Sequence, residues 1–214
     1  MKDNYRLKGL RKRLIKTLRE EGIRDERILK AFEHVPRHYF MDSAFADAAY
    51  ENKAFPIGKG QTISQPYTVA FQTELLQVKK NDKVLEIGTG SGFQAAILAE
   101  IGARVFTVER QEELYLKAKD LLADLGYDQV YCFYQDGNLG LPELAPFDRI
   151  IFTAGCSEFP EKLLGQLNLN GIAIIPVGEK VQTMYRITRT GLNEYKKETF
   201  GQFRFVPFLK GVMG

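Results

Sequence analysis

Short apolar runs alternate with longer amphipathic stretches through the middle of the chain. The runs, such as "KVLEIG" and "ARVFTVE", are apolar almost throughout, and the stretches between them repeat apolar residues at helical spacing. Apolar strands separated by helices are typical of a parallel sheet that is covered on both faces. The predicted strands are 83–88, 103–109, 129–135, 147–155 and 171–178. The helices predicted beside them are 92–102, 112–126 and 160–167.

Both ends of the chain depart from this alternation. Leu7, Leu10, Leu14 and Leu18 recur at helical spacing and predict an amphipathic helix near the start. Further elements predicted outside the parallel sheet are helices 4–21, 25–34 and 66–78, an irregular region between the last two, and antiparallel strands 183–190 and 194–208. The fold class is therefore α/β: a doubly wound, mostly parallel, seven-stranded Rossmann-like sheet with an N-terminal helical extension and a β-rich C-terminal tail.

Composition excludes several classes of protein. Hydrophobic residues make up 44% of the 214 residues and charged residues 27%, which is ordinary for a globular chain with a core. Cys132 and Cys156 stand neither in a CxxC pair nor near a histidine pair, which argues against a disulfide framework or a zinc site. The start of the chain has no apolar signal core, and no stretch approaches the roughly 18 apolar residues of a membrane span. We expect a cytoplasmic protein without a metal site or a membrane partner.

Charge is distributed unevenly along the chain. Residues 1–30 hold eleven Lys or Arg against five acidic residues, so this segment carries +6 and the remainder −3 of the net +3. A basic arm can bind nucleic acid. The leucine spacing within the same segment instead favours the solvated face of a helix, so nucleic-acid binding is not expected.

A glycine-rich loop follows the first strand of the parallel sheet. The sequence "VLEIGTGSGFQ" has the spacing G-x-G-x-G, whereas the dinucleotide fingerprint is G-x-G-x-x-G. With an acid two residues before the first glycine, it resembles motif I of the S-adenosylmethionine-dependent methyltransferases. The cofactor-binding residues predicted from this loop are Glu86, Gly88, Thr89, Gly90, Ser91 and Gly92.

The next two strand ends carry further groups suited to a nucleoside. Glu109 ends the second strand, 21 residues after Gly88, where a carboxylate can accept both ribose hydroxyls of either NAD or S-adenosylmethionine. At the end of the third strand, Asp136 can accept from an adenine amino group and the backbone of Gly137 can serve a ring nitrogen. The alternative interpretation of this Asp-Gly pair is a plain turn.

The end of the fourth strand excludes common methyl acceptors. It reads "FTAGCSEFP" and lacks the (D/N/S)-P-P-(Y/F/W) motif of enzymes that methylate amino groups of bases. The Pro-Cys nucleophile needed for cytosine C5 methylation is also absent from the sequence. We therefore interpret Cys156 as a structural residue.

A longer set of motifs closely resembles the protein-L-isoaspartate O-methyltransferase family. It comprises "AYENKAFPIGKGQTISQPYTVAFQTELL", "VLEIGTGSGFQAAILA", "PFDRIIFTAG", "IIPVG" and "RFVPF", and it extends from about Val35 to Phe208. The resemblance implies one domain, 1–214, with an extension and active-site loop at 1–78, a cofactor-binding core at 79–180 and C-terminal strands at 181–214. It also implies S-adenosylmethionine as cofactor, S-adenosylhomocysteine as product, and an isoaspartyl α-carboxylate in aged proteins or peptides as acceptor. The methyl ester then cyclises to a succinimide, whose hydrolysis returns some aspartate.

The same resemblance assigns residues to the acceptor side. It places the hydroxyl of Ser64 at the methyl-transfer centre. Residues expected to hold the peptide are Ile57, Gly58, Thr62, Val206 and Pro207. Lys59 stands where many relatives have His in "GHGQTIS", "QDG" replaces the commoner "GDG" and "TAGC" replaces "TAAA". The first of these departures would change the charge of the loop near the acceptor.

The expected chemistry requires no general base. A carboxylate with a pKa near 4 is ionised at neutral pH and can attack a sulfonium methyl directly. We expect Ser64 to orient the acceptor by donating a hydrogen bond, and the alternative is that it caps the helix beginning at Pro66. His34 and His38 are interpreted as structural.

Other functions stay open at this level. They are a methyltransferase acting on RNA or a small molecule, a dehydrogenase, and a binding module that retains the cofactor fold without activity. The loop around Ser64 favours an isoaspartyl methyltransferase over all three alternatives. We expect the protein to be a monomer.

Overall fold

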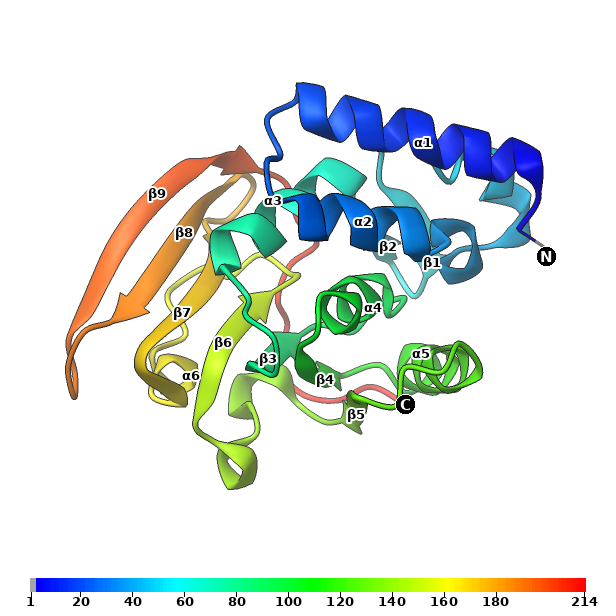
Figure 1. Ribbon diagram of the computed structural model, residues 1–214. Helices are drawn as coiled ribbons and strands as arrows, with labels where there is room; N and C mark the ends of the chain where they lie inside the picture. The colour runs from blue at the N-terminus through cyan, green and yellow to red at the C-terminus, as the bar shows by residue number, and fades with distance from the viewer. Residues whose placement is uncertain (1–2) are drawn as a thin grey trace.

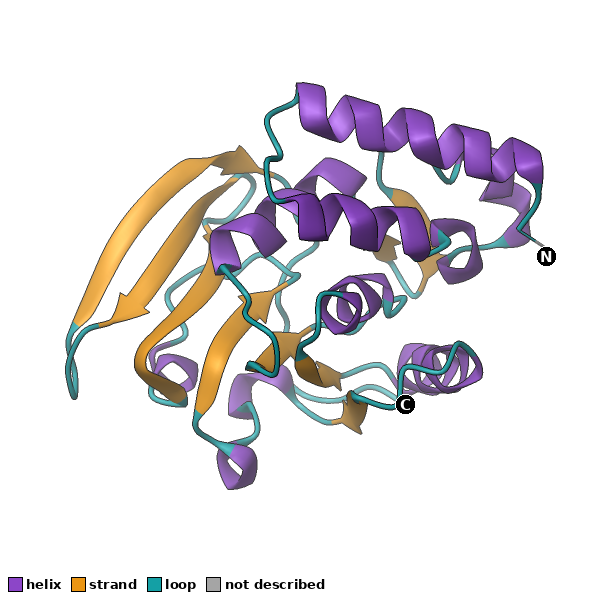
Figure 2. Ribbon diagram, viewed as in Figure 1, coloured by secondary structure: helices purple, strands orange, loops and turns teal. Residues whose placement is uncertain are grey.

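A seven-stranded sheet runs through the middle of the protein, as the computed structural model of residues 3–214 shows (Figures 1 and 2). Its strands are β3 (Lys83–Ile87), β4 (Arg104–Glu109), β5 (Val130–Tyr134), β6 (Phe147–Phe152), β7 (Leu167–Val177), β8 (Gln182–Arg189) and β9 (Tyr195–Phe203). Their order is β5-β4-β3-β6-β7-β8-β9; the first five are parallel, β8 runs antiparallel to β7, and β9 runs antiparallel to β8. The predicted fold class is confirmed.

The two faces of the sheet are covered unequally. The helices α3 (Pro66–Leu76), α4 (Phe93–Glu100) and α5 (Glu112–Asp124) pack on one face. The other face is covered by short elements: α6 (Glu161–Leu164), η3 (Gly137–Leu139) and η4 (Pro142–Leu144). Successive residues of a strand point to opposite faces, so Val84 belongs to the first core and Leu85 to the second. The helix predicted over 160–167 is a single turn because β7 already begins at Leu167.

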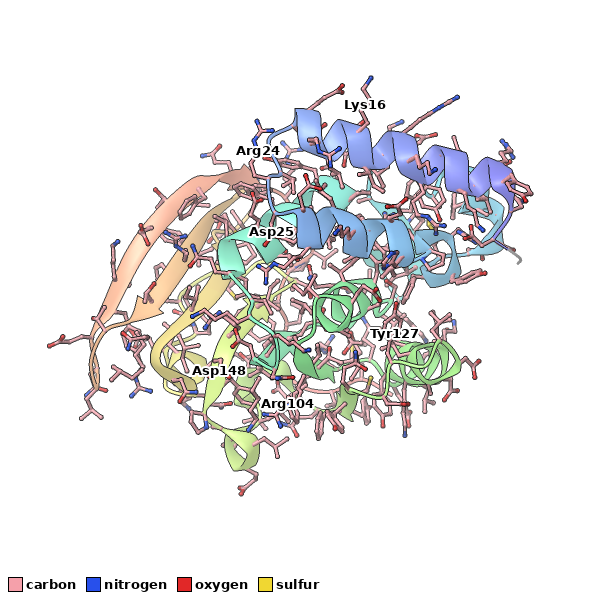
Figure 3. The ribbon with its side chains drawn as sticks, viewed as in Figure 1. Lys16, Arg24, Asp25, Arg104, Tyr127 and Asp148 are labelled. Carbon is pink, nitrogen blue, oxygen red and sulfur yellow. The ribbon has the colours of Figure 1, made fainter. Side chains whose placement is uncertain are left out.

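The helical extension lies on top of the first helical layer. It consists of α1 (Tyr5–Glu20) and α2 (Glu26–His34), and α2 packs on α4 (Figure 1). Leu7, Leu14 and Leu18 are buried, as the leucine spacing predicts, while Lys16 points away from the body of the protein (Figure 3). None of the helices within residues 3–214 is long and apolar enough to cross a membrane.

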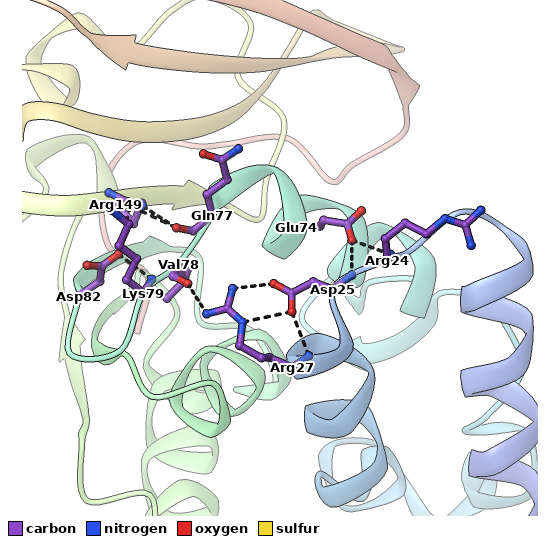
Figure 4. A network of polar contacts seen from close by, with 9 residues as sticks. All are labelled: Arg24, Asp25, Arg27, Glu74, Gln77, Val78, Lys79, Asp82 and Arg149. Carbon is purple, nitrogen blue, oxygen red and sulfur yellow. Dashed lines mark hydrogen bonds and ion pairs between the residues drawn. The ribbon is translucent and has the colours of Figure 1, made fainter.

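A polar network attaches this extension to the end of α3 (Figure 4). The backbone N–H groups of Arg24 and Asp25 both donate to Glu74, each at 2.7 Å. Arg27 forms an ion pair with Asp25 at 2.6 Å and donates to the carbonyl of Val78 at 3.0 Å. The turn between α1 and α2 is therefore fixed by α3, the same helix that follows the Ser64 loop.

The region predicted to be irregular, from about 35 to 65, has a definite structure. It contains η1 (Arg37–Phe40), η2 (Ser43–Ala48) and a hairpin of β1 (Phe55–Gly58) and β2 (Gln61–Ile63). The Arg37 side chain is 1% exposed, and burial lowers its pKa to about 9. It donates to the carbonyls of Ala49 at 2.9 Å, Lys53 at 3.1 Å and Ser64 at 2.9 Å. One buried guanidinium thus joins three parts of a segment that has little regular hydrogen bonding of its own.

The C-terminal tail leaves the sheet earlier than predicted. The last strand ends at Phe203, and the following residues cross the carboxyl ends of the parallel strands to finish beside β5 and α5 (Figure 1). Gly155 N donates to Val206 O and Phe208 N donates to Gly155 O, both at 2.8 Å. Near its end, Met213 N donates to Arg110 O at 2.7 Å. The tail therefore forms one wall of whatever binds at these strand ends.

Candidate active site

A cavity lies where the carboxyl ends of β3, β4 and β6 meet the β1–β2 hairpin and the tail. Ligands of open α/β sheets bind at this edge of the sheet. Predicted site residues that line the cavity are Thr62, Ser64, Gly88, Thr89, Gly90, Ser91, Glu109, Gly137, Val206 and Pro207. The structure therefore brings most of the predicted cofactor residues together with part of the predicted acceptor site.

The glycine loop uses its first and third glycines for different reasons. Gly88 has φ +100°, and a Cβ there would lie 2.4 Å from Thr153 Oγ1. Gly92 has φ +85° at the N-cap of α4, and its Cβ would approach Leu122 at 3.1 Å. A side chain at Gly88 would thus clash with Thr153 at the cavity wall, whereas Gly92 allows α4 to pack against α5 and does not line the cavity.

Glu109 is held rigidly at the cavity wall. Its carboxylate accepts hydrogen bonds from the backbone N–H groups of Gly90 and Arg110 at 2.9 Å and of Gln111 at 3.0 Å. The residue is only 5% exposed, yet it lines the cavity. A carboxylate has about four acceptor positions, so one remains for a ribose hydroxyl.

The two residues of the Asp-Gly pair after β5 have different roles. Asp136 accepts from Asn138 N and Nδ2 at 2.9 Å and from Gly211 N at 2.8 Å. Burial opposes ionisation, but these hydrogen bonds and Arg110 hold its pKa below the usual value. Asp136 caps η3 and ties down the tail without lining the cavity, so the turn interpretation describes it. The neighbouring Gly137 does line the cavity.

Glu86 lies beneath the glycine loop, outside the cavity. It is 0% exposed, and neither carboxylate oxygen has a hydrogen-bond partner among the described residues. Burial raises its pKa to about 8, partly offset by the hydroxyl of Thr107 opposite it on β4. A carboxyl group in this position is mostly protonated at neutral pH.

Ser64 lies between the cavity and a second hollow. Its carbonyl accepts from Arg37, while its hydroxyl has no hydrogen-bond partner within residues 3–214. The N-cap of α3 is Gln65, so the capping alternative for Ser64 is wrong. The hydroxyl is therefore available to a ligand.

The second hollow is a groove that continues outward from Ser64. It shares Thr62, Ser64, Thr153 and Val206 with the cavity. Its other lining residues are Ala54, Gln65, Tyr67, Thr68, Val181, Gln202, Phe203, Arg204 and Phe205. A ligand in the cavity and a second ligand in the groove would meet beside Ser64.

Two predicted acceptor residues lie elsewhere. Ile57 and Gly58 line a third hollow on the other side of the hairpin, together with Leu114 of α5. Ile57 Cδ1 lies 3.6 Å from the position of a Cβ on Gly90, so this side chain packs over the glycine loop. The structure does not bring these two residues to the groove.

Several lining residues were missed by sequence reasoning. The missed residues are Gln61, Ile63, Val69, Gln72, Ile87, Phe93, Gln94, Val108, Arg110, Gln111, Thr153, Ala154, Phe208 and Leu209. Thr153 and Gln111 could have been predicted from the sequence, because Thr153 directly follows β6 and Gln111 lies two residues after β4, both of which are parallel strands. Gln72 and Gln94 lie on helix faces, where the sequence offers no comparable signal.

The strand order, the glycine loop after β3 and the acidic end of β4 match the Rossmann-like fold of the class I S-adenosylmethionine-dependent methyltransferases. The family model described as "Protein-L-isoaspartate(D-aspartate) O-methyltransferase (PCMT)" matches residues 9–213. The chain belongs to this family.

Curated relatives match over nearly their whole length. A protein-L-isoaspartate O-methyltransferase of Christiangramia forsetii is 55% identical over 98% of this chain and 99% of its own. One of Flavobacterium psychrophilum is 53% identical with the same coverage. These relatives confirm the family, the activity and the enzyme class that the motifs predict.

Solved structures agree with the fold. A protein-L-isoaspartate O-methyltransferase superposes with a TM-score of 0.84 at 30% identity, over 92% of this chain and 65% of that chain. A putative enzyme of this name from Plasmodium falciparum, in complex with S-adenosyl-L-homocysteine, gives a TM-score of 0.82 at 24% identity, over 98% and 100%. The dehydrogenase and nucleic-acid methyltransferase alternatives are therefore set aside.

Proposed function

We propose that this protein transfers a methyl group from S-adenosylmethionine to the α-carboxylate of isoaspartyl residues, with Ser64 orienting the acceptor. The observation that carries the proposal is the place of Ser64, which lines both the cavity and the groove. The cofactor occupies the cavity and the damaged peptide occupies the groove.

The cavity residues fit the cofactor. Gly88 and Gly137 let the backbone pack closely at the cavity, because a Cβ on Gly88 would overlap Thr153 Oγ1 and one on Gly137 would lie 2.9 Å from Ile87 and 3.0 Å from Phe208. Glu109 receives one ribose hydroxyl, and the backbone at Gly137 faces the base. When bound, S-adenosylmethionine supplies an electrophilic methyl group. Asp136 acts on the tail, and Glu86 supports the loop from below.

The reaction needs positioning more than proton transfer. The isoaspartyl carboxylate is ionised at neutral pH, so its oxygen attacks the methyl carbon without a base. The new bond is O–CH₃, and the electron pair of the broken C–S bond remains on sulfur. Ser64 donates a hydrogen bond that fixes one acceptor oxygen, leaving the other aligned for attack.

The remaining candidate nucleophiles and bases have structural roles. Burial raises the pKa of the Cys156 thiol to about 12, so it is not a thiolate at neutral pH. His38 Nδ1 is hydrogen-bonded to the Tyr50 hydroxyl at 2.8 Å, and His34 pairs with Glu100 at 2.8 Å. Neither histidine lines the cavity or the groove.

The proposal extends to the setting of the enzyme. Its partners are isoaspartyl proteins and peptides, held in the groove by Thr62 and Val206, with Pro207 beside them on the cavity side, and it works as a single-domain monomer. A cytoplasmic location is supported by the two free cysteines. In the proposed function, the basic face of α1 is a solvated surface and does not bind nucleic acid.

Substitution of Ser64 tests the proposal at its centre. We predict that Ser64→Ala lowers kcat/KM for an isoaspartyl peptide by about ten- to a hundred-fold, since one charge-assisted hydrogen bond is lost. The affinity for S-adenosylhomocysteine, measured by calorimetry, should stay near that of the wild type. The control is Ser157→Ala at an exposed position outside the site. Full activity of Ser64→Ala on the peptide would contradict the assigned role.

A further inference from the structure

The β1–β2 hairpin lines the cavity through its second strand, and its tip touches the start of α5. Gly58, Lys59 and Gly60 all have positive φ, at +96°, +51° and +69°, which makes the tip a tight reversal. The strand β1 packs Ile57 over the glycine loop, and β2 leads directly to Ser64. Because Gln61, Thr62 and Ile63 of β2 line the cavity, the position of the tip sets both the roof of the cavity and the approach to Ser64.

Two contacts anchor the tip to the segment that follows β4. Lys59 Nζ forms an ion pair with Glu113 Oε2 at 2.9 Å, and Gln111 Nε2 donates to the carbonyl of Lys59 at 3.2 Å. Gln111 is 6% exposed, and its own N–H donates to the Glu109 carboxylate. The hairpin tip is thus connected to the residue that receives the ribose.

The carboxylate at this contact is ionised at neutral pH. Hydrogen bonds from Lys117 and Lys59 lower the pKa of Glu113 to about 2, so this carboxylate is ionised. Lys117 pairs with the other oxygen of Glu113 at 2.6 Å, within α5 itself. A histidine in place of Lys59 would be largely uncharged at neutral pH. The lysine therefore makes a permanent ion pair possible at this point.

We propose that Lys59 is a positioning residue that holds the hairpin closed over the bound cofactor through its ion pair with Glu113. Loss of the pair opens the roof of the cavity and speeds release of the cofactor product. The proposal rests on the proposed function only for the identity of the ligand in the cavity. Both side chains are about half exposed, at 46% and 48%, so the expected effect is about two- to five-fold.

The test measures release of labelled S-adenosylhomocysteine by chase with unlabelled ligand, in the absence of any peptide. Lys59→Met and Glu113→Gln should each raise the dissociation rate about two- to five-fold, and the double variant no further. Lys59→Arg should restore slow release. Lys117→Met is the matched control, since it removes the other partner of Glu113, and its rate should equal that of the wild type. Raising the salt concentration should speed release from the wild type but not from Lys59→Met.

Three results would overturn the proposal: unchanged release from Lys59→Met, equal acceleration by Lys117→Met, or additive effects in the double variant. Steady-state kinetics provides a second readout. The KM for S-adenosylmethionine should rise with the dissociation rate, while the KM for the peptide at saturating cofactor should change less. Because release is measured without peptide, failure here would leave the isoaspartyl activity standing. Failure of peptide methylation would likewise leave the release data interpretable.

Discussion

At the scale of single residues, Glu86 shows that the acidic residue before a glycine loop can be buried beneath the loop and need not line the cavity. It stands fully buried, with both oxygens unpaired within residues 3–214, and its pKa is raised to about 8. Folding therefore favours its protonated form. The stabilisation is complete below the unfolded pKa near 4.5 and is lost as the pH rises toward 8.

Glu86→Gln should reveal this linkage. The amide keeps the shape of the neutral acid and cannot ionise, so the variant should gain thermal stability relative to the wild type as the pH rises from 5 to 8. Near pH 4.5, where Glu86 is protonated in the folded wild type, the melting temperature of Glu86→Gln should show no such gain over that of the wild type. The exposed Glu143→Gln is the control and should show no such trend. A difference between Glu86→Gln and the wild type that stays constant with pH would contradict the protonated state.

At the scale of elements, the segment between α2 and α3 depends on one side chain. Arg37 joins the carbonyls of Ala49, Lys53 and Ser64, and its guanidinium lies 5.2 Å from the centre of the Phe93 ring. Lysine keeps the charge but cannot reach three carbonyls in a fixed plane. The hairpin and the Ser64 loop would then lose their common attachment.

Arg37→Lys should therefore lower both stability and activity. We expect a loss of about 2 kcal/mol in the free energy of unfolding, because buried carbonyls are left unpaired. The value of kcat should fall as well, since the Ser64 backbone loses its partner. Urea unfolding and peptide methylation measure the two effects, and Arg13→Lys on the exposed face of α1 is the control. Wild-type stability in Arg37→Lys would show that the segment is held by other contacts.

The elements also show what the sequence can and cannot predict. The parallel strands were predicted because their burial on both faces leaves continuous apolar runs, as in β3 and β4. The β1–β2 hairpin was not, since its stability comes from Arg37, Gln111 and Glu113, which are distant in the sequence. The local sequence pattern does not predict contacts between residues that are distant in the sequence.

At the scale of the whole molecule, two long segments close one edge of the sheet. The hairpin covers the glycine loop, and the tail crosses the strand ends as far as Arg110 and Asp136 (Figure 1). The motifs predicted which loops surround the cofactor but not which side chains face it. Asp136, predicted to contact adenine, accepts from Gly211 of the tail, and Ile57, predicted to contact the peptide, packs over Gly90. Resemblance to a family indicates which residues form the loops of the site, whereas the direction in which their side chains point depends on tertiary packing.

The most direct test of the central claim compares two peptides that differ only in isoaspartate versus aspartate. Each is incubated with the wild-type enzyme and methyl-labelled S-adenosylmethionine, and base-labile methanol is counted. The account predicts label on the isoaspartyl peptide and background on the aspartyl peptide. Equal label on both, or none on either while S-adenosylhomocysteine still binds, would contradict it.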